Sequence, residues 1–150
     1  MTQPTNNVIT LAAQTTAGNI SFTDANGFAV DSVSATMDGF HPAIAGLTTN
    51  AGTVTLQSGG LVTQTQRILA SAFSLQGSGP YQLTNGANAL ILGVSTVSGS
   101  FDVTTGGAIT QSGAVTVIGT TTLAAGATTL RLIMRTTSSV PSQSPTGTTS

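Results

Sequence analysis

Few residues in this sequence are able to do acid–base chemistry. The 150 residues include four acidic side chains, all aspartates, one histidine and three arginines, but no lysine, glutamate or cysteine. General acid–base catalysis needs two titratable groups held together with separated pKa values. Such a group would form if the fold brought Asp24, Asp31 or Asp38 into one groove with Arg67. Asp31 and Asp38 also lie near His41 in the sequence.

Other reaction classes lack their characteristic residues. Without cysteine there are no disulfides, thiol nucleophiles or thiolate ligands. A single histidine leaves little for a zinc site or a proton shuttle, so we expect His41 to be a loop residue. No serine lies in a Gly-x-Ser-x-Gly context, and Gly59-Gly60 lacks the helix and lysine of a phosphate-binding loop. We therefore predict no catalytic residue, no cofactor and no metal site.

The composition predicts a β protein with an uncharged polar surface. Hydrophobic residues make up 39% of the chain and charged residues 5%, whereas disordered chains combine low hydrophobicity with many charges. The sequence holds 29 threonines, 16 serines and 18 glycines. Serine, threonine and glycine disfavour helices, while threonine, valine and isoleucine fit the pleated surface of a sheet.

The charge balance argues against a nucleic-acid partner, and the absence of long apolar runs argues against a membrane-spanning segment. The formal net charge is −1, so there is no basic excess to bind the phosphates of a nucleic acid, and we predict no nucleic-acid partner. No run approaches the roughly 18 apolar residues that span a bilayer, and we predict no membrane-spanning segment. Residues 1–7 have neither the basic nor the apolar region of a signal peptide.

Short runs of alternating apolar residues, each bounded by glycine or asparagine, indicate half-buried strands. The inward positions that we predict are Ile20, Phe22, Phe28, Val30, Val54, Leu56, Leu61, Phe73, Leu75, Phe101, Val103, Ile109, Val115, Val117, Leu130, Leu132 and Met134.

Internal repeats are the strongest signal in the sequence. Residues 52–64 match residues 99–111 without a gap at an offset of 47, and residues 18–23 match residues 52–57 at an offset of 34. Together these offsets give a longer repeat of 81 residues. All three copies share a frame in which a glycine is followed by alternating apolar residues.

Repeated strands and turns without helices between them predict an all-β fold, a single-stranded parallel β-helix. Each coil of such a solenoid takes about 20 residues, and successive coils stack about 4.8 Å apart. The 81-residue repeat would then span about four coils, and the repeated region, from residue 7 to about residue 134, about six. At this offset Asp24 falls on Thr105 and Asp102 on Ser21, so no two aspartates share a coil position. We therefore expect solvated turn carboxylates rather than a catalytic cluster.

The expected organisation has three parts. Residues 1–6 form a lead-in, residues 7–135 form the β-helix, and residues 136–150 form a proline-punctuated, apolar-poor tail that we expect to be disordered. Residues 35–45 have no counterpart in the other copies and contain Asp-Gly and His-Pro, which predicts a loop extruded from the solenoid.

Several strings resemble the repeats of filamentous haemagglutinin-type proteins. They are Asn7-Val-Ile-Thr-Leu-Ala-Ala13, Gly18-Asn-Ile-Ser-Phe-Thr-Asp-Ala25, Gly60-Leu-Val-Thr-Gln-Thr-Gln66 and Gly106-Gly-Ala-Ile-Thr-Gln-Ser-Gly113. The resemblance covers roughly residues 7–129. It implies a right-handed parallel β-helix of the kind that forms the rods of large bacterial exoproteins exported by two-partner secretion. Such proteins work in adhesion, biofilm formation or the presentation of a toxin.

From this resemblance we expect a non-enzymatic structural and adhesive rod segment. The implied location is the bacterial surface or the medium. The implied partners are the remainder of the parent exoprotein and a receptor or glycan on a host or neighbouring cell.

Two alternatives make different structural predictions. A carbohydrate-active β-helical enzyme would gather Asp24, Asp31 or Asp38 with Arg67 in one groove. A threonine-rich ice-binding protein would align pairs such as Thr53 and Thr55 on one flat face, although the unequal offsets of 34 and 47 argue against so regular an array.

Overall fold

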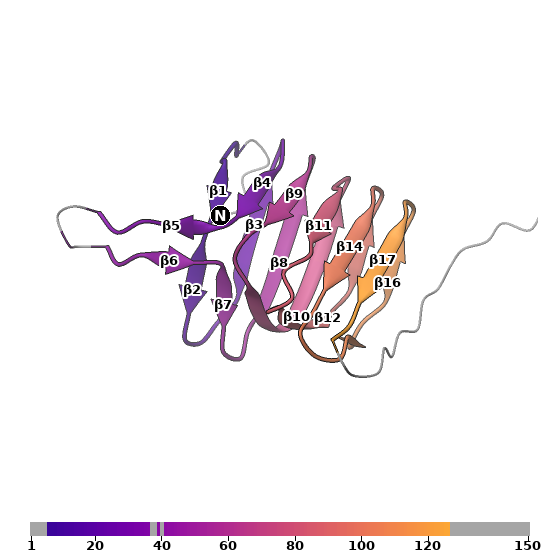
Figure 1. Ribbon diagram of the computed structural model, residues 1–150. Helices are drawn as coiled ribbons and strands as arrows, with labels where there is room; N and C mark the ends of the chain where they lie inside the picture. Colours follow the sequence, from indigo (N-terminus) through magenta and orange to yellow (C-terminus); the bar gives the residue numbers. More distant parts are fainter. Residues whose placement is uncertain (1–5, 37–38, 40, 127–150) are drawn as a thin grey trace, which may run out of the picture.

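The computed structural model describes residues 6–36, 39 and 41–126, and within these ranges the chain forms only β-strands and turns. The strands stack coil upon coil into a rod, and successive parts of the sequence follow one another along it (Figure 1). Six strands, one from each coil, follow one another in one sheet with parallel pairing. The predicted all-β solenoid of about six coils is therefore confirmed.

Two sheets wrap around the core. The six-stranded sheet contains, in spatial order, β1 (Thr10–Leu11), β4 (Phe28–Val30), β9 (Val62–Gln64), β11 (Tyr81–Leu83), β14 (Phe101–Thr104) and β17 (Thr121–Ala124).

The nine-stranded sheet has two rows, which are joined because the long strand β10 (Ile68–Gly77) contributes to both. In the first row β10 is accompanied by β2 (Ala13–Thr15), β7 (Leu47–Thr49), β12 (Ala89–Leu92) and β15 (Thr110–Gln111). In the second row it is accompanied by β3 (Ile20–Asp24), β8 (Thr53–Ser58), β13 (Ser95–Val97) and β16 (Val115–Val117).

The register between coils shows which sequence repeats are real. Ile20 pairs with Val54, so the offset of 34 is a true coil-to-coil step. Later steps are shorter: Val62 pairs with Tyr81, and Tyr81 with Phe101, at offsets of 19 and 20. The step of 34 residues is longer because the chain leaves the solenoid between β4 and β7 before it returns to complete the second coil.

The offset of 47, and with it the 81-residue repeat, is wrong as a coil register. It aligns β8 of the nine-stranded sheet with β14 of the six-stranded sheet. The error arises because strands on different sides of a coil share one frame, a glycine turn followed by alternating inward residues. Asp24 pairs with Ser58, not Thr105. Asp102 pairs with Gln82 and Thr122, not Ser21.

The core is a set of columns in which inward side chains stack from coil to coil. One column runs through Phe28, Val62, Tyr81 and Phe101, which are register partners and at most 4% exposed. Each such side chain contributes roughly 1.5–3 kcal/mol by leaving water. Val54 is fully buried, and most of the predicted inward positions belong to the buried core.

One predicted core position is wrong. Leu61 is 44% exposed, while its neighbour Val62 is fully buried. Leu61 still belongs to the turn, because β9 begins only at Val62. The positions predicted at Leu130, Leu132 and Met134, like the tail at residues 136–150, lie outside the described residues.

A buried amide network stabilises the corner between the six-stranded sheet and the first row. Asn88 is 1% exposed, and its Oδ1 accepts a hydrogen bond from the Ile68 backbone N–H at 2.8 Å. Its Nδ2 donates to the Thr104 carbonyl at 2.9 Å and contacts Gln64 Oε1 at 3.0 Å. Because Ile68, Asn88 and Thr104 belong to successive coils, this one side chain links three layers of the stack.

Between β4 and β7, residues 31–36 and 41–46 form an arm that projects from the side of the rod (Figure 1). Its described base is an antiparallel pair of β5 (Ser32–Val33) and β6 (Ile44–Ala45). The Gly46 N–H donates to the Asp31 carbonyl at 3.0 Å and closes the arm where it meets the coil. The predicted loop at residues 35–45 thus overlaps this arm, and its last two residues form β6.

We expect Gly46→Ala to destabilise the protein. Gly46 has a φ of +68°, and a Cβ at this position would lie 2.2 Å from the Arg67 carbonyl oxygen in the next coil. The left-handed backbone alone costs a residue with a side chain roughly 1–3 kcal/mol, and the close contact adds to this. Gly86→Ala is the matched control, because it has no positive φ and no atom within 4 Å of the added methyl. Urea unfolding of both variants measures the difference, and equal free energies of unfolding would contradict this account of the arm's base.

Candidate binding site at the base of the arm

A polar pocket of about 390 Å³ lies on the outside of the solenoid, next to the base of the arm. It is lined by Gln14, Ala45, Thr48, Gln66, Arg67, Asn85 and Ala87. None of these lining residues is acidic.

Four successive coils build this pocket. Gln14 in β2 and Thr48 in β7 are register partners in the first row. Thr48 points outward because its neighbours Leu47 and Thr49 are both buried, as the two-residue period of a strand requires. Gln66 and Arg67 occupy the turn before β10, so they extend the same outer surface into the third coil.

The fourth coil supplies a wall that is already hydrogen-bonded. Asn85 Nδ2 donates to the Thr65 carbonyl at 2.7 Å, and Asn85 Oδ1 accepts from the Ala87 N–H at 2.8 Å. These bonds fix the turn before β12, so Asn85 and Ala87 hold a definite shape at one side of the pocket. Asn85 therefore has little capacity left for a ligand.

The other polar side chains of the pocket are available. The guanidinium of Arg67 and the carboxamides of Gln14 and Gln66 make no hydrogen bond or ion pair in the part of the chain that the structure describes. One cation and two amides, each of which can donate and accept, therefore converge on one opening. This arrangement can bind a small polar or anionic group by hydrogen bonds.

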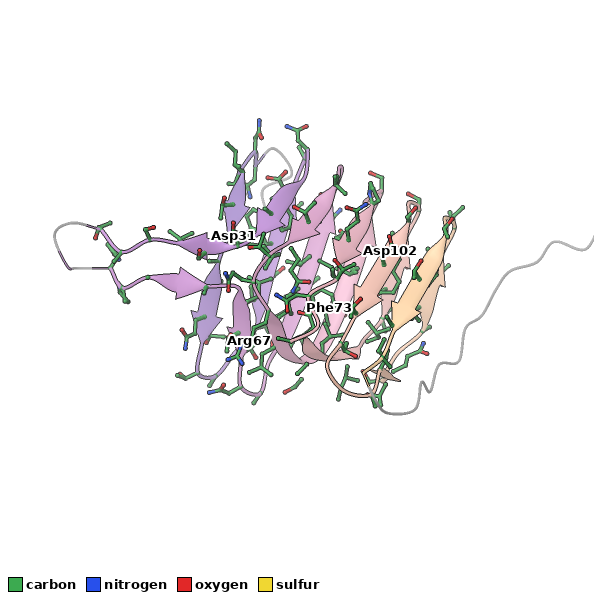
Figure 2. All side chains as sticks on the ribbon, in the orientation of Figure 1. Asp31, Arg67, Phe73 and Asp102 are labelled. Carbon is green, nitrogen blue, oxygen red and sulfur yellow. The ribbon has the colours of Figure 1, made fainter. Side chains whose placement is uncertain are left out.

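The structure does not bring Asp24 or Asp31 into the pocket with Arg67. Asp24 is 1% exposed at the end of β3, and its carboxylate accepts hydrogen bonds from the backbone N–H groups of Val8, Asn26 and Gly27 at 2.8–2.9 Å. Asp31 accepts hydrogen bonds from the Thr65 hydroxyl and from the Ser32 N–H. Figure 2 shows Asp31, Arg67 and Asp102 at separate places on the rod. Asp38 lies outside the described residues.

The pKa values of these two aspartates follow from their partners. Burial raises the pKa of Asp24, but the three backbone N–H donors together outweigh burial and hold that pKa below its usual value. The Thr65 hydroxyl and the Ser32 N–H lower the pKa of Asp31. Both carboxylates are therefore stabilised in their charged form, which suits acceptors of turn hydrogen bonds better than general acids.

Metal-ligand groups and aromatic platforms are also not found in the described ranges. No cluster of three histidine or acidic residues that could hold a metal ion occurs among those residues. His41 lies exposed on the arm, where its carbonyl accepts a hydrogen bond from the Thr36 N–H at 3.2 Å. Tyr81 is fully buried in the core, which raises the pKa of its hydroxyl, and that hydroxyl donates to the Gln76 carbonyl at 2.6 Å.

The outward columns are mixed rather than regular arrays of threonine. In the second row the register partners from coil to coil are Thr23, Gln57, Gln76, Thr96 and Thr116. Across the last three strands of the six-stranded sheet they are Gln82, Asp102 and Thr122. Thr53 and Thr55 of β8 pair with Ala72 and Ser74 in the next coil. Neither sheet therefore presents the aligned threonine pairs that ice binding would need in these columns.

Residues 79–136 match a family model described as repeats of unknown function (DUF5649), so this part of the chain is similar to that family. The match begins in the turn before β11 and leaves the arm, Gln14, Thr48, Gln66 and Arg67 outside it. No curated protein and no solved structure matches the chain. In the described part of the chain, no helix is long and apolar enough to cross a bilayer.

The sequence placed Arg67 beside aspartates only under the enzymatic alternative, and it gave no binding site. It missed Gln14, Thr48, Gln66 and Asn85 as parts of one site. The two-residue period predicts that Gln14 and Thr48 face outward, but their adjacency depends on the coil step of 34 residues between β2 and β7. That step is visible in the repeat of residues 18–23 and 52–57, and it is the one signal that could have located the pocket.

We expect stability to fall in acid through Asp24. Its folded pKa lies below the unfolded value of about 3.9, so its charge stabilises the fold above that pH. This stabilisation is lost as the pH falls through the folded pKa. The free energy of unfolding, measured with urea from pH 7 to pH 2, should decrease in this acid range for the wild type.

The variant Asp24→Asn should be less stable at pH 7 and should lose less stability in acid. Asp31→Asn is the comparison, because its carboxylate is exposed and its hydrogen bonds contribute less. Parallel pH profiles for the wild type and Asp24→Asn would show that the three N–H bonds do not stabilise the charged form.

Proposed function

We propose that this chain is a non-enzymatic structural and adhesive rod segment of a filamentous haemagglutinin-like protein, secreted or held on a bacterial surface. The observation that carries the proposal is the continuous stack of coils, with apolar columns inside and polar columns outside that are uncharged except at Asp102. Acidic residues are scattered along the described part of this stack, and the buried one among them, Asp24, accepts hydrogen bonds at a turn.

The geometry of the stack suits a spacer. Strands of adjacent coils are about 4.8 Å apart, so six coils extend roughly 30 Å along the rod. Each inner coil is hydrogen-bonded to the coils before and after it, so a pull on the rod is shared among many backbone bonds. Further repeats of the same kind would lengthen the rod without changing its cross-section.

The surface chemistry suits contacts made by hydrogen bonds. Outward columns present threonine hydroxyls and glutamine amides, and the net charge of the chain is only −1. Such a surface does not attract partners by long-range electrostatics. Repetition of weak polar contacts along a rigid rod raises the overall avidity for a cell surface that carries many copies of one glycan.

The test is adhesion of beads coated with the purified chain to epithelial cells and to bacterial cells. Coated beads should adhere more than beads coated with an inert protein. Beads that carry the Val54→Asp variant should lose that gain, because the substitution places a charge at a fully buried position and so disrupts the coils. No adhesion above the inert control on either cell type would contradict the proposal.

A parallel assay of acidic polysaccharides tests the enzymatic alternative. The proposal expects no chain shortening and no new reducing ends. Turnover that disappears in Asp31→Asn or Arg67→Gln would instead favour a carbohydrate-active enzyme.

A further inference from the structure

We propose that the pocket at the base of the arm binds an acidic saccharide, whose carboxylate pairs with the guanidinium of Arg67. This inference deepens the proposed adhesive function, on which it rests, by naming the site and the chemical class of its ligand.

Arg67 supplies the anion contact. Its guanidinium makes no hydrogen bond or ion pair within the described chain, and no acidic residue lines the pocket. A guanidinium presents its N–H donors in a planar fork that matches a carboxylate in two parallel hydrogen bonds. Because the whole chain carries a net charge of −1, a polyanion is not held by general attraction and depends on this cation.

The remaining side chains match the rest of a sugar. Gln14 and Gln66 present carboxamides that each donate and accept hydrogen bonds, and Thr48 adds a hydroxyl. Sugar hydroxyls likewise donate and accept, so an array of this kind recognises them better than an array of cations would. The methyl groups of Ala45 and Ala87 give two small apolar contacts for the C–H groups of a sugar ring.

The backbone that carries these groups is held in place before a ligand arrives. The Arg67 carbonyl accepts a hydrogen bond from the Leu47 N–H at 3.2 Å, and the Gln66 N–H donates to the Val30 carbonyl at 3.2 Å. Binding therefore orders a few side chains rather than a loop, which lowers its entropic cost.

The size and position of the pocket indicate one or two sugar units of a longer chain. Its volume of about 390 Å³ lies at the lower end of the range for small-molecule sites. It crosses four coils, because its residues come from four successive layers of the stack. A saccharide chain can thus lie along the rod while one acidic unit enters the pocket.

The test is titration calorimetry of the full chain with trisaccharides of galacturonate, glucuronate and sialate. The same trisaccharides with their carboxyl groups methyl-esterified are the neutral probes. At least one acidic trisaccharide should bind, and its ester should bind about tenfold or more weakly. Absence of binding to all three at millimolar concentration, or equal binding of acid and ester, would overturn the inference.

Variants locate the site. Arg67→Gln should weaken binding roughly 10- to 100-fold, because it removes a charged hydrogen-bonding partner, and Gln66→Ala should weaken it less. Gln57→Ala is the matched control, since Gln57 is an exposed glutamine of the second row outside the pocket. Circular dichroism checks that each variant is folded. Unchanged affinity in Arg67→Gln, or an equal loss in Gln57→Ala, would place the saccharide elsewhere.

Adhesion and saccharide binding can fail separately. If beads adhere but the trisaccharides do not bind, the inference is wrong and the adhesive function stands. If an acidic trisaccharide binds through Arg67 but coated beads do not adhere, the site is real and the adhesive function is wrong.

Discussion

The parallel hydrogen-bonded register between successive coils is the constraint on which the rest of the structure depends. Side chains alternate along each strand, so a slip of one residue would turn every inward column out to solvent. The column of Phe28, Val62, Tyr81 and Phe101 exists only in the register that the structure shows. The same register places Gln14 beside Thr48 on the outer surface, so the core and the pocket are consequences of one pairing.

The corners must satisfy their polar groups without breaking that register. Asn88 joins three coils through its amide, and Asp24 accepts three backbone N–H groups at the turn after β3. No buried side-chain polar atom lacks a hydrogen-bond partner in the part of the chain that the structure describes. Because buried polar groups cost free energy unless they are paired, these residues fix how the strands of one coil meet. They do so with amides and a turn carboxylate, while the guanidinium of Arg67 has no partner among the described residues.

Local pattern was sufficient to predict the class of fold and most inward positions, since burial in a strand follows a two-residue period. It was not sufficient to predict the neighbours of a residue. The frame around Val54 matches the frame around Phe101 because every strand obeys the same rule after a glycine, although the two residues lie in different sheets. Local pattern also fails to predict where a strand begins: two apolar residues, Leu61 and Val62, stand side by side, and the pattern does not tell which of them starts β9 and points inward. The pocket was missed for this reason: its residues become neighbours only through the coil steps and the arm, which no local spacing encodes.

Disulfide trapping tests the register most directly, because the chain contains no cysteine of its own. Gln82 and Asp102 are register partners on the outside of adjacent coils, so their Cα atoms lie at a separation that a disulfide can bridge. The double variant Gln82→Cys with Asp102→Cys should form an intramolecular disulfide under native, oxidising conditions, detected by a mass loss of about 2 Da and by faster migration in a non-reducing gel. The double variant Ser21→Cys with Asp102→Cys is the control and should stay reduced, because its two positions lie in β3 and β14, which belong to different sheets. A disulfide in the second variant and none in the first would contradict the coil register and, with it, the pocket and the rod.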